Sequence, residues 1–218
     1  MKRFFLTVFG ILLFAGVVNG QSAGGDHDFT PLPKPKVGEA VATFGGGCFW
    51  SMSEAMLELK GVNKVISGYA GGTTKNPTYD QVASKTTGHA ECSQVYYDPK
   101  LISFATIARA FFFAHDPTEL NRQGPDEGTE YRSIAFYRTP EEKNIISGLI
   151  KQINSSKHYP KPIVTQVVPF TAFYPAENYH QGYYRLSPGS TYIMQVSKPK
   201  VLKFRKVMQA ELKPEFQK

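Results

Sequence analysis

Short apolar runs and longer amphipathic stretches follow one another along the chain. The short runs predict strands over 40–44, 62–69, 90–97, 131–137 and 163–169. Apolar residues three or four positions apart predict helices over 51–60, 103–115 and 141–153. Ser103 is expected to cap the second helix, and the third is expected to begin just after Pro140.

The order of these elements, with strand, helix, strand, strand, helix, strand as its core, predicts an α+β fold. We expect a ferredoxin-like two-layer sandwich, in which a mainly antiparallel mixed sheet has helices packed on it. Residues 116–130 and 174–192 contain many polar and turn-forming residues and little periodicity. Long coil segments of this kind are usually functional or mobile, and we expect the same of these two.

The first twenty residues have the pattern of a secretory signal. Lys2 and Arg3 precede an apolar stretch over 4–18, and small residues follow it before Gln21. A membrane anchor is the alternative, but this stretch is shorter than the roughly 20 residues that a spanning helix needs. We therefore expect a signal peptide over 1–20 and an exported protein, periplasmic or extracellular, without stable membrane association after cleavage.

The rest of the chain divides into three parts. Residues 21–38 are rich in Gly, Ser, Asp and Pro, which predicts a flexible lead-in. One globular domain is expected over 39–206, because 218 residues with 41% hydrophobic side chains suffice for a single core. A C-terminal tail is expected over 207–218, and the mature protein is expected to be a monomer.

The net charge of +7 raises the question of nucleic-acid binding. Much of the excess lies at the C-terminal end, where residues 198–218 contain seven basic and two acidic side chains. Such a stretch is usually a solvated surface, so we expect no nucleic-acid partner.

The chain contains two cysteines, of which Cys48 has the setting of a reactive thiol. It follows three glycines, at the point where a predicted strand becomes a predicted helix. A helix N-terminus lowers the pKa of a thiol, and the thiolate is the reactive form. Phe49 and Trp50 come next and either form an apolar wall that grips a small nonpolar group or belong to the core.

Side chains alternate between the two faces of the predicted strand 90–97. Glu91 therefore points away from the face that Cys92 occupies. Glu91 is either a solvated charge or a carboxyl buried near Cys48, in which case burial would raise its pKa and make it a proton donor. The same alternation predicts that Cys92 forms no disulfide with Cys48 unless the strand moves.

A resemblance to a known family rests on motifs along the whole predicted domain. The run FGGGCFW at 44–50 resembles the nucleophile signature of the peptide methionine sulfoxide reductase A family. Further motifs similar to that family's follow in the same order: SGYAGG at 67–72, NPTY at 76–79, TGHAE at 87–91, HDPT at 115–118, NRQG at 121–124, GTEYRS at 128–133 and YHQ at 179–181. The resemblance implies that 39–206 is a catalytic domain of this family.

The resemblance implies a thiol-dependent reduction of methionine S-sulfoxide, free or in peptides and proteins, with no metal and no bound cofactor. Cys48 would attack the sulfoxide sulfur and become a sulfenic acid, and Glu91 would protonate the oxygen. Tyr79 and Tyr131 would donate hydrogen bonds to that oxygen. The implied role in the cell is the repair of oxidised exported proteins.

The resemblance also implies four substrate-binding positions. Phe49 and Trp50 would hold the methyl group of the substrate. Asp126 matches a position that helps to shape the family's site, although Asn is commoner there, and His180 would contact the substrate.

The chain departs from the family where many relatives carry a second cysteine. Ser51 stands at one such position, and the segment 192–194, ahead of Pro199, contains no cysteine at the other. We therefore expect an external thiol reductant, either a thioredoxin-like or glutaredoxin-like protein or a small thiol, to regenerate Cys48. A disulfide with Cys92 after strand movement is the alternative route.

Three other readings of the sequence stay open. Cys48 with His89 or His180 would suit a thiol hydrolase. A secreted peptide-binding module would use a Cys48–Cys92 disulfide as a structural staple. A reductase without a resolving thiol would act as a scavenger that turns over once.

Overall fold

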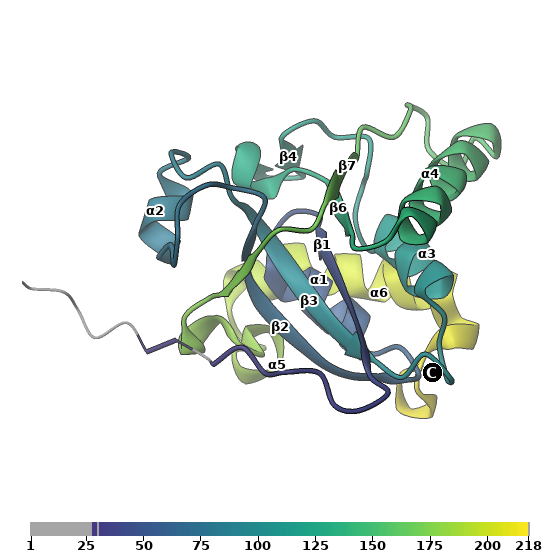
Figure 1. The fold of residues 1–218 in the computed structure, drawn as a ribbon, viewed down its shortest axis with the longest axis horizontal. Coiled ribbons are helices and arrows are strands. Elements are labelled where there is room, and N and C mark those ends of the chain that lie inside the picture. The colour runs from purple at the N-terminus through teal and green to yellow at the C-terminus, as the bar shows by residue number, and fades with distance from the viewer. Residues whose placement is uncertain (1–27, 30, 218) are drawn as a thin grey trace, which may run out of the picture.

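The chain folds around one six-stranded mixed sheet with helices packed on it (Figure 1). This computed structural model describes residues 28–29 and 31–217, so the signal peptide predicted over 1–20 lies outside the described residues. The strands are β1 (Ala40–Gly45), β2 (Val62–Ala70), β3 (Ala90–Tyr97), β6 (Ile134–Tyr137), β7 (Gln166–Pro169) and β8 (Phe173–Pro175). The helices are α1 (Phe49–Leu57), α2 (Tyr79–Ala83), α3 (Phe104–Ala114), α4 (Pro140–Ser155), α5 (Tyr183–Leu186) and α6 (Lys198–Met208).

The strand order confirms the predicted ferredoxin-like sandwich. The sheet runs β7-β6-β1-β3-β2-β8, and its four central strands β6, β1, β3 and β2 pair antiparallel. β7 joins β6 in parallel, and β8 joins β2 antiparallel, which makes the sheet mixed. A second, two-stranded sheet consists of β4 (Arg122–Gln123) and β5 (Asp126–Glu127) within the predicted coil segment 116–130.

The bounds of most elements agree with the sequence prediction, with two exceptions among the strands. Ser103 caps α3 as predicted, because its side chain accepts a hydrogen bond from the backbone N–H of Thr106. The strand predicted over 131–137 begins only at Ile134, because a 3₁₀ turn occupies Thr129–Tyr131. The strand predicted over 163–169 begins at Gln166.

The core lies between the sheet and the helices α1, α3, α4 and α6. Phe44 of β1 stacks on Phe111 of α3 with ring centroids 4.8 Å apart. The predicted alternation along β3 is confirmed, since Val95 faces this core whereas Cys92 belongs to a smaller apolar cluster with Phe136. Glu91 and Cys92 therefore point to opposite faces of the sheet.

The packed part of the chain extends further than the predicted domain 39–206. Leu212 is fully buried and forms an isolated antiparallel β-bridge with Leu59. Part of the predicted tail therefore belongs to the core. The lead-in also contacts the domain, because Tyr96 Oη donates a hydrogen bond of 2.8 Å to the carbonyl of Pro33. None of the helices in the described part of the chain has the length and apolar character needed to cross a membrane.

Candidate active site

A cavity of about 300 Å³ opens at the N-terminus of α1. Residues from seven places in the sequence line it: Cys48, Phe49, Trp50, Tyr79, Glu91, Asp126, Tyr131, Tyr183, Ser190 and Tyr192. Seven of the eight predicted site residues are therefore brought together. The cavity combines a thiol and two carboxyls with aromatic walls that include four tyrosines.

The glycines before Cys48 allow the backbone to turn sharply from β1 into α1. Gly47 has φ +81°, and a Cβ on it would lie 2.4 Å from Cγ of Gln123. A Cβ on Gly45 would lie 2.7 Å from the carbonyl oxygen of Glu91. Side chains would therefore collide at both positions. Cys48 lies where the strand becomes the helix, as predicted, and α1 begins at Phe49, two residues earlier than the predicted Ser51.

The thiol of Cys48 is protonated at neutral pH in this arrangement. Burial raises the pKa of Cys48 well above its ordinary value, and the negative charges of Glu91 and Asp126 raise it further. Hydrogen bonds from the backbone N–H of Trp50 and from the Tyr192 hydroxyl oppose this rise. The helix N-terminus lowers this pKa as expected, through the Trp50 N–H, but burial outweighs that effect and the net direction is upward, contrary to the expectation of a lowered pKa.

Glu91 is a buried acid, which excludes the reading of a solvated charge. Its side chain is 3% exposed, and its Oε2 accepts a hydrogen bond of 3.0 Å from the backbone N–H of Phe49. Burial raises the pKa of Glu91 to about 8, with Asp126 and Glu130 adding to the rise and the Phe49 hydrogen bond opposing it. Glu91 therefore carries a proton at neutral pH that it can donate into the cavity.

Three tyrosines of the cavity keep their protons, and the hydroxyl of Tyr192 donates its hydrogen bond to Asp126. Burial, followed by the charge of Glu91, raises the pKa of both Tyr79 and Tyr131. Burial also raises the pKa of Tyr192, whose hydroxyl donates a hydrogen bond of 2.5 Å to Asp126 Oδ2. All three phenols keep their protons at neutral pH and remain hydrogen-bond donors.

Sequence reasoning missed Tyr183, Ser190 and Tyr192 as individual residues of the cavity. They come from the C-terminal coil segment 174–192, which was expected as a whole to be functional or mobile. Nothing in the local sequence separates Tyr192 from the other tyrosines among the 12 in the chain. A tertiary contact, the one with Asp126, is what assigns it to the site.

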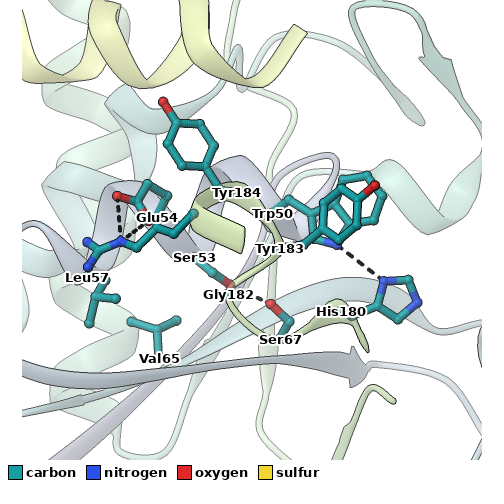
Figure 2. A pocket seen from close by; sticks show the side chains of 11 residues that line it. Trp50, Ser53, Glu54, Leu57, Val65, Ser67, His180, Gly182, Tyr183 and Tyr184 are labelled. Carbon is teal, nitrogen blue, oxygen red and sulfur yellow. Dashed lines mark hydrogen bonds and ion pairs between the residues drawn. The ribbon is translucent and has the colours of Figure 1, made fainter. Parts of the chain in front are cut away.

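His180 is the predicted site residue that does not line the cavity, and its contact with substrate stays a prediction. Its Nδ1 accepts a hydrogen bond of 3.2 Å from the indole N–H of Trp50 (Figure 2). The imidazole lies behind Trp50, beside a smaller pocket of about 40 Å³ that Ser53 and Ser67 also line. His180 therefore orients the indole whose stacked partner is Tyr183, with ring centroids 4.0 Å apart.

The hydrolase reading requires a histidine beside Cys48. The structure places neither candidate, His89 or His180, in the cavity that Cys48 lines. His89 Nδ1 accepts from the backbone N–H of Gly72, and its Nε2 lies 2.7 Å from the carbonyl oxygen of Thr74. His180 is engaged by Trp50. Since neither histidine lines the cavity, neither can serve as a general base for Cys48 in this arrangement.

Cys92 is separated from the cavity by the sheet itself. Both cysteines are free thiols in this structure, and Cys92 is fully buried in the apolar cluster on the other face. Burial raises the pKa of Cys92 to about 12, so this thiol is unreactive. The arrangement does not support a structural Cys48–Cys92 disulfide.

Metal ligands do not cluster in the described part of the chain. No group of three or more His, Cys, Asp or Glu side chains there is arranged to hold a metal ion. The carboxyls nearest to Cys48 are instead surrounded by hydrogen-bond donors, with the Phe49 N–H on Glu91 and the Tyr192 hydroxyl on Asp126.

Comparison with known proteins gives one consistent family. The sequence profile of the family described as peptide methionine sulfoxide reductase matches residues 40–212. Peptide methionine sulfoxide reductase MsrA 1 of Rhodopirellula baltica is 47% identical over 173 residues, which are 79% of this chain and 89% of that protein. The corresponding protein of Haloquadratum walsbyi is 48% identical over 172 residues, 79% of this chain and 98% of that protein.

Solved structures agree with the sequence comparison. Methionine sulfoxide reductase A of Corynebacterium diphtheriae superposes with a TM-score of 0.65 at 31% identity, covering 76% of this chain and 87% of that one. The reduced form of Mxr1 from Saccharomyces cerevisiae superposes with a TM-score of 0.66 at 31% identity, covering 72% and 91%.

Proposed function

Since the chain belongs to the peptide methionine sulfoxide reductase A family, and is thus a peptide-methionine (S)-S-oxide reductase, we propose that the sulfur of Cys48 accepts the oxygen atom that the substrate loses. The observation that carries this proposal is the pairing of a thiol with a protonated carboxyl in one cavity. Cys48 and Glu91 both line that cavity, and the pKa of Glu91 is raised to about 8 by burial.

The cavity suits the two ends of a methionine sulfoxide group. Phe49 and Trp50 form an apolar wall that accepts the methyl group. Glu91, Tyr79 and Tyr131 present protons to the sulfoxide oxygen, a strong hydrogen-bond acceptor. Asp126 acts indirectly, because it accepts a hydrogen bond from the hydroxyl of Tyr192 and so fixes the position of that side chain.

The oxygen-transfer step balances without any further reactant. The Cys48 sulfur attacks the sulfoxide sulfur while Glu91 donates its proton to the oxygen. The sulfur–oxygen bond of the substrate and the sulfur–sulfur bond formed in the attack then both break as the oxygen bonds to the Cys48 sulfur, which becomes a sulfenic acid. The proton that Cys48 gave up returns to Glu91, and methionine leaves with two electrons more than the sulfoxide had.

We propose that an external thiol regenerates Cys48. One thiol attacks the sulfenic acid and releases water, and a second thiol resolves the mixed disulfide to free Cys48 and an external disulfide. Ser51 and Ile193 stand in the segments where relatives carry resolving cysteines, and Cys92 lies on the other face of the sheet. A thioredoxin-like or glutaredoxin-like protein and a small thiol are the candidate reductants.

Two serine variants test this proposal, one for each cysteine. Cys48→Ser should reduce methionine S-sulfoxide at less than about one hundredth of the wild-type rate, because it lacks the nucleophile. Cys92→Ser is the matched control and should keep multiple turnovers with dithiothreitol. Normal activity of Cys48→Ser would refute the assignment, and loss of multiple turnover in Cys92→Ser would show that Cys92 resolves the sulfenic acid. A wild-type protein that stops after one turnover with dithiothreitol would instead be a scavenger.

We also propose that the protein is exported and repairs oxidised exported proteins. The support is the basic start at Lys2 and Arg3 and the apolar stretch over 4–18. N-terminal sequencing of the protein expressed with its full sequence in a bacterial host should find a mature chain that begins at Gln21. An intact Met1 on a cytoplasmic product would contradict export.

A further inference from the structure

Tyr79, which lines the cavity, is the first residue of a very short helix. α2 has five residues, and Val82 is the buried one among them. Helices this short are not stable by themselves, so contacts with other segments must hold them in place. The position of the Tyr79 side chain in the cavity therefore depends on what fixes the start of α2.

The first backbone N–H groups of α2 have no partners within the helix and need acceptors from outside it. A capping box satisfies two of the groups at this end, because the side chains of Thr78 and Gln81 each accept from the other's backbone N–H. The N–H of Tyr79 instead donates a hydrogen bond of 2.8 Å to Oε1 of Glu177, 98 residues further along the chain. Glu177 therefore anchors the residue that begins the helix.

The carboxyl of Glu177 is itself fixed by the central sheet. Its Oε2 accepts a hydrogen bond of 3.1 Å from the hydroxyl of Tyr69, a fully buried residue of β2. The ring of Tyr69 lies against that of Phe49, with ring centroids 5.9 Å apart. Glu177 thus connects the start of α2 to the part of the sheet that also supports the wall of the cavity.

No ion pair accounts for the burial of Glu177. The residue is 3% exposed, and the ion pairs among the described residues do not include it. Burial lowers the pKa of the nearby His180 to about 4 against the opposing charge of Glu177, so His180 is neutral at pH 7. Buried acids are normally paired with a cation. The printed side-chain partners of Glu177 are instead the two donors on Tyr69 and Tyr79.

We propose that Glu177 is a positioning residue of the reductase: through the backbone N–H of Tyr79, it holds the start of α2 where the Tyr79 side chain lines the cavity. This inference rests on the proposed role of Tyr79 as a donor to the sulfoxide oxygen, and it deepens that role. A donor stabilises charge on a reacting oxygen best when it is held in place before the reaction. Glu177 does not line the cavity, so it acts through Tyr79.

Three replacements of Glu177 separate the reach of its oxygen from its charge. Glu177→Gln removes the charge but keeps an oxygen at the same reach, whereas Glu177→Asp keeps the charge and draws the oxygen back. Glu177→Ala removes both. Asp80→Ala is the matched control, because Asp80 is an exposed acid next to Tyr79 in the same helix. Circular dichroism checks that each variant is folded.

The test measures the single-turnover rate of methionine formation from methionine S-sulfoxide, without any thiol, so that the regeneration of Cys48 does not enter. Glu177→Ala and Glu177→Asp should lower the maximal rate about three- to tenfold and leave the half-saturating sulfoxide concentration nearly unchanged. Glu177→Gln and Asp80→Ala should keep the wild-type rate within about twofold.

A double-mutant cycle shows whether the effect of Glu177 passes through Tyr79. Tyr79→Phe should lower the rate about tenfold or more, because it removes the hydroxyl. In the Tyr79→Phe background, Glu177→Ala should cost less than about twofold, since the group that it positions is already gone.

Equal losses from Glu177→Ala with and without the Tyr79 hydroxyl would overturn the proposal, and so would a Glu177→Gln variant as slow as Glu177→Ala. Either result leaves the proposed function intact. Tyr79→Phe at the wild-type rate would overturn this inference together with the proposed role of Tyr79.

Hydrogen exchange of the Tyr79 amide tests the anchor in the wild-type protein, without substrate. The amide should exchange slowly, because Glu177 accepts its hydrogen bond. If neither Glu177→Ala nor Glu177→Asp folds, this measurement decides, and exchange as fast as that of an exposed loop amide would overturn the proposal.

Discussion

Cys48 and Glu91 face the same cavity, and burial pushes the pKa of each in the same direction. Burial favours the neutral form of an acid, so the thiol keeps its proton and Glu91 keeps one up to about pH 8. A proton on Glu91 is useful because the sulfoxide oxygen leaves sulfur only after protonation. At the residue scale, a protonated carboxyl that can donate a proton therefore lies beside a thiol that is itself still protonated.

Replacement of Glu91 by Gln should slow the chemical step and change its pH dependence. The wild-type kcat/KM should fall as pH rises through about 8, because Glu91 loses the proton that it donates. Glu91→Gln should lower kcat/KM by about 10²-fold or more and remove this alkaline limb near pH 8. Steady-state assays from pH 6 to 9.5 with methionine S-sulfoxide check this, and a variant with the wild-type limb would assign the limb to another group.

The same substitution should stabilise the protein at alkaline pH. Unfolded Glu91 loses its proton near pH 4.5, whereas the folded protein holds it to about pH 8. The folded state binds more protons between these values, so the contribution of Glu91 to the free energy of unfolding falls as pH rises across this window. Above pH 8 the buried carboxylate costs roughly 3 to 5 kcal/mol, which Glu91→Gln avoids.

Urea denaturation at pH 4.5 and pH 8.5 measures this effect. Glu91→Gln should have the higher free energy of unfolding at pH 8.5, and the difference should nearly vanish at pH 4.5. Exposed Glu141→Gln serves as the control and should show no such pH-dependent difference. Equal stabilities of Glu91→Gln and the wild type at pH 8.5 would mean that Glu91 is not buried as a neutral acid.

At the scale of elements, the turn from β1 into α1 sets the position of Cys48, the proposed nucleophile. Gly47 has a positive φ, and its Cα faces Gln123, whose side-chain amide is held by hydrogen bonds of 3.0 Å to the backbone N–H and carbonyl of Asp116. Gln123 therefore has little freedom to move aside. The turn connects Cys48 to the loop that carries Asp126.

Gly47→Ala should be clearly more destabilising than Gly124→Ala. Gly124 also has a positive φ, +63°, but a Cβ there would meet nothing within 4 Å, so it measures the backbone cost alone. That cost is about 1–2 kcal/mol, and the collision with Gln123 should add at least about 1 kcal/mol more in Gly47→Ala. Urea denaturation compares the two, and equal losses would show that the turn tolerates a side chain.

Local signals allowed several elements to be predicted from the sequence, but two elements that carry such signals were missed. The alternation along β3 and the N-cap at Ser103 are local features, and both agree with the structure. α6 was taken as part of a basic end, although Val201, Phe204 and Met208 recur at helical spacing on its buried face. α2 was missed too, although Thr78 and Gln81 form a capping box.

The site residues divide in the same way. Cys48 and Glu91 stand in recognisable motifs, so the sequence points to them directly. The pKa of Cys48 and the position of His180 beside Trp50 depend on contacts between distant segments. Burial in particular is a property of the folded chain, and it reversed the predicted direction of the Cys48 pKa.

At the scale of the whole molecule, the C-terminal segment closes the core as well as the site. Tyr192 lines the cavity, a π-helical segment follows over Ile193–Ser197, and α6 then packs on α1 and α3. Glu58, the C-cap residue of α1, is fully buried and accepts two hydrogen bonds, of 2.6 and 2.9 Å, from the guanidinium of Arg205. The two helices are thereby held together next to the site.

A chain that stops at Lys206 should be severely destabilised. It lacks Met208 and Leu212, which are 1% and 0% exposed, and each fully buried side chain of this kind contributes about 1.5–3 kcal/mol. The sum approaches the 5–15 kcal/mol of a typical domain. A chain that stops at Lys213 keeps both residues and is the matched control, and equal melting temperatures of the two would place the domain end at 206 after all.

The central claim, that oxygen passes from substrate to the Cys48 sulfur, is tested most directly by mass spectrometry. The reduced protein is mixed with one equivalent of methionine S-sulfoxide without any thiol, and its peptides are analysed after quenching with dimedone, which traps sulfenic acids. The account predicts one equivalent of methionine and one dimedone adduct on Cys48, with Cys92 unmodified. Methionine formed while Cys48 remains a free thiol would contradict it.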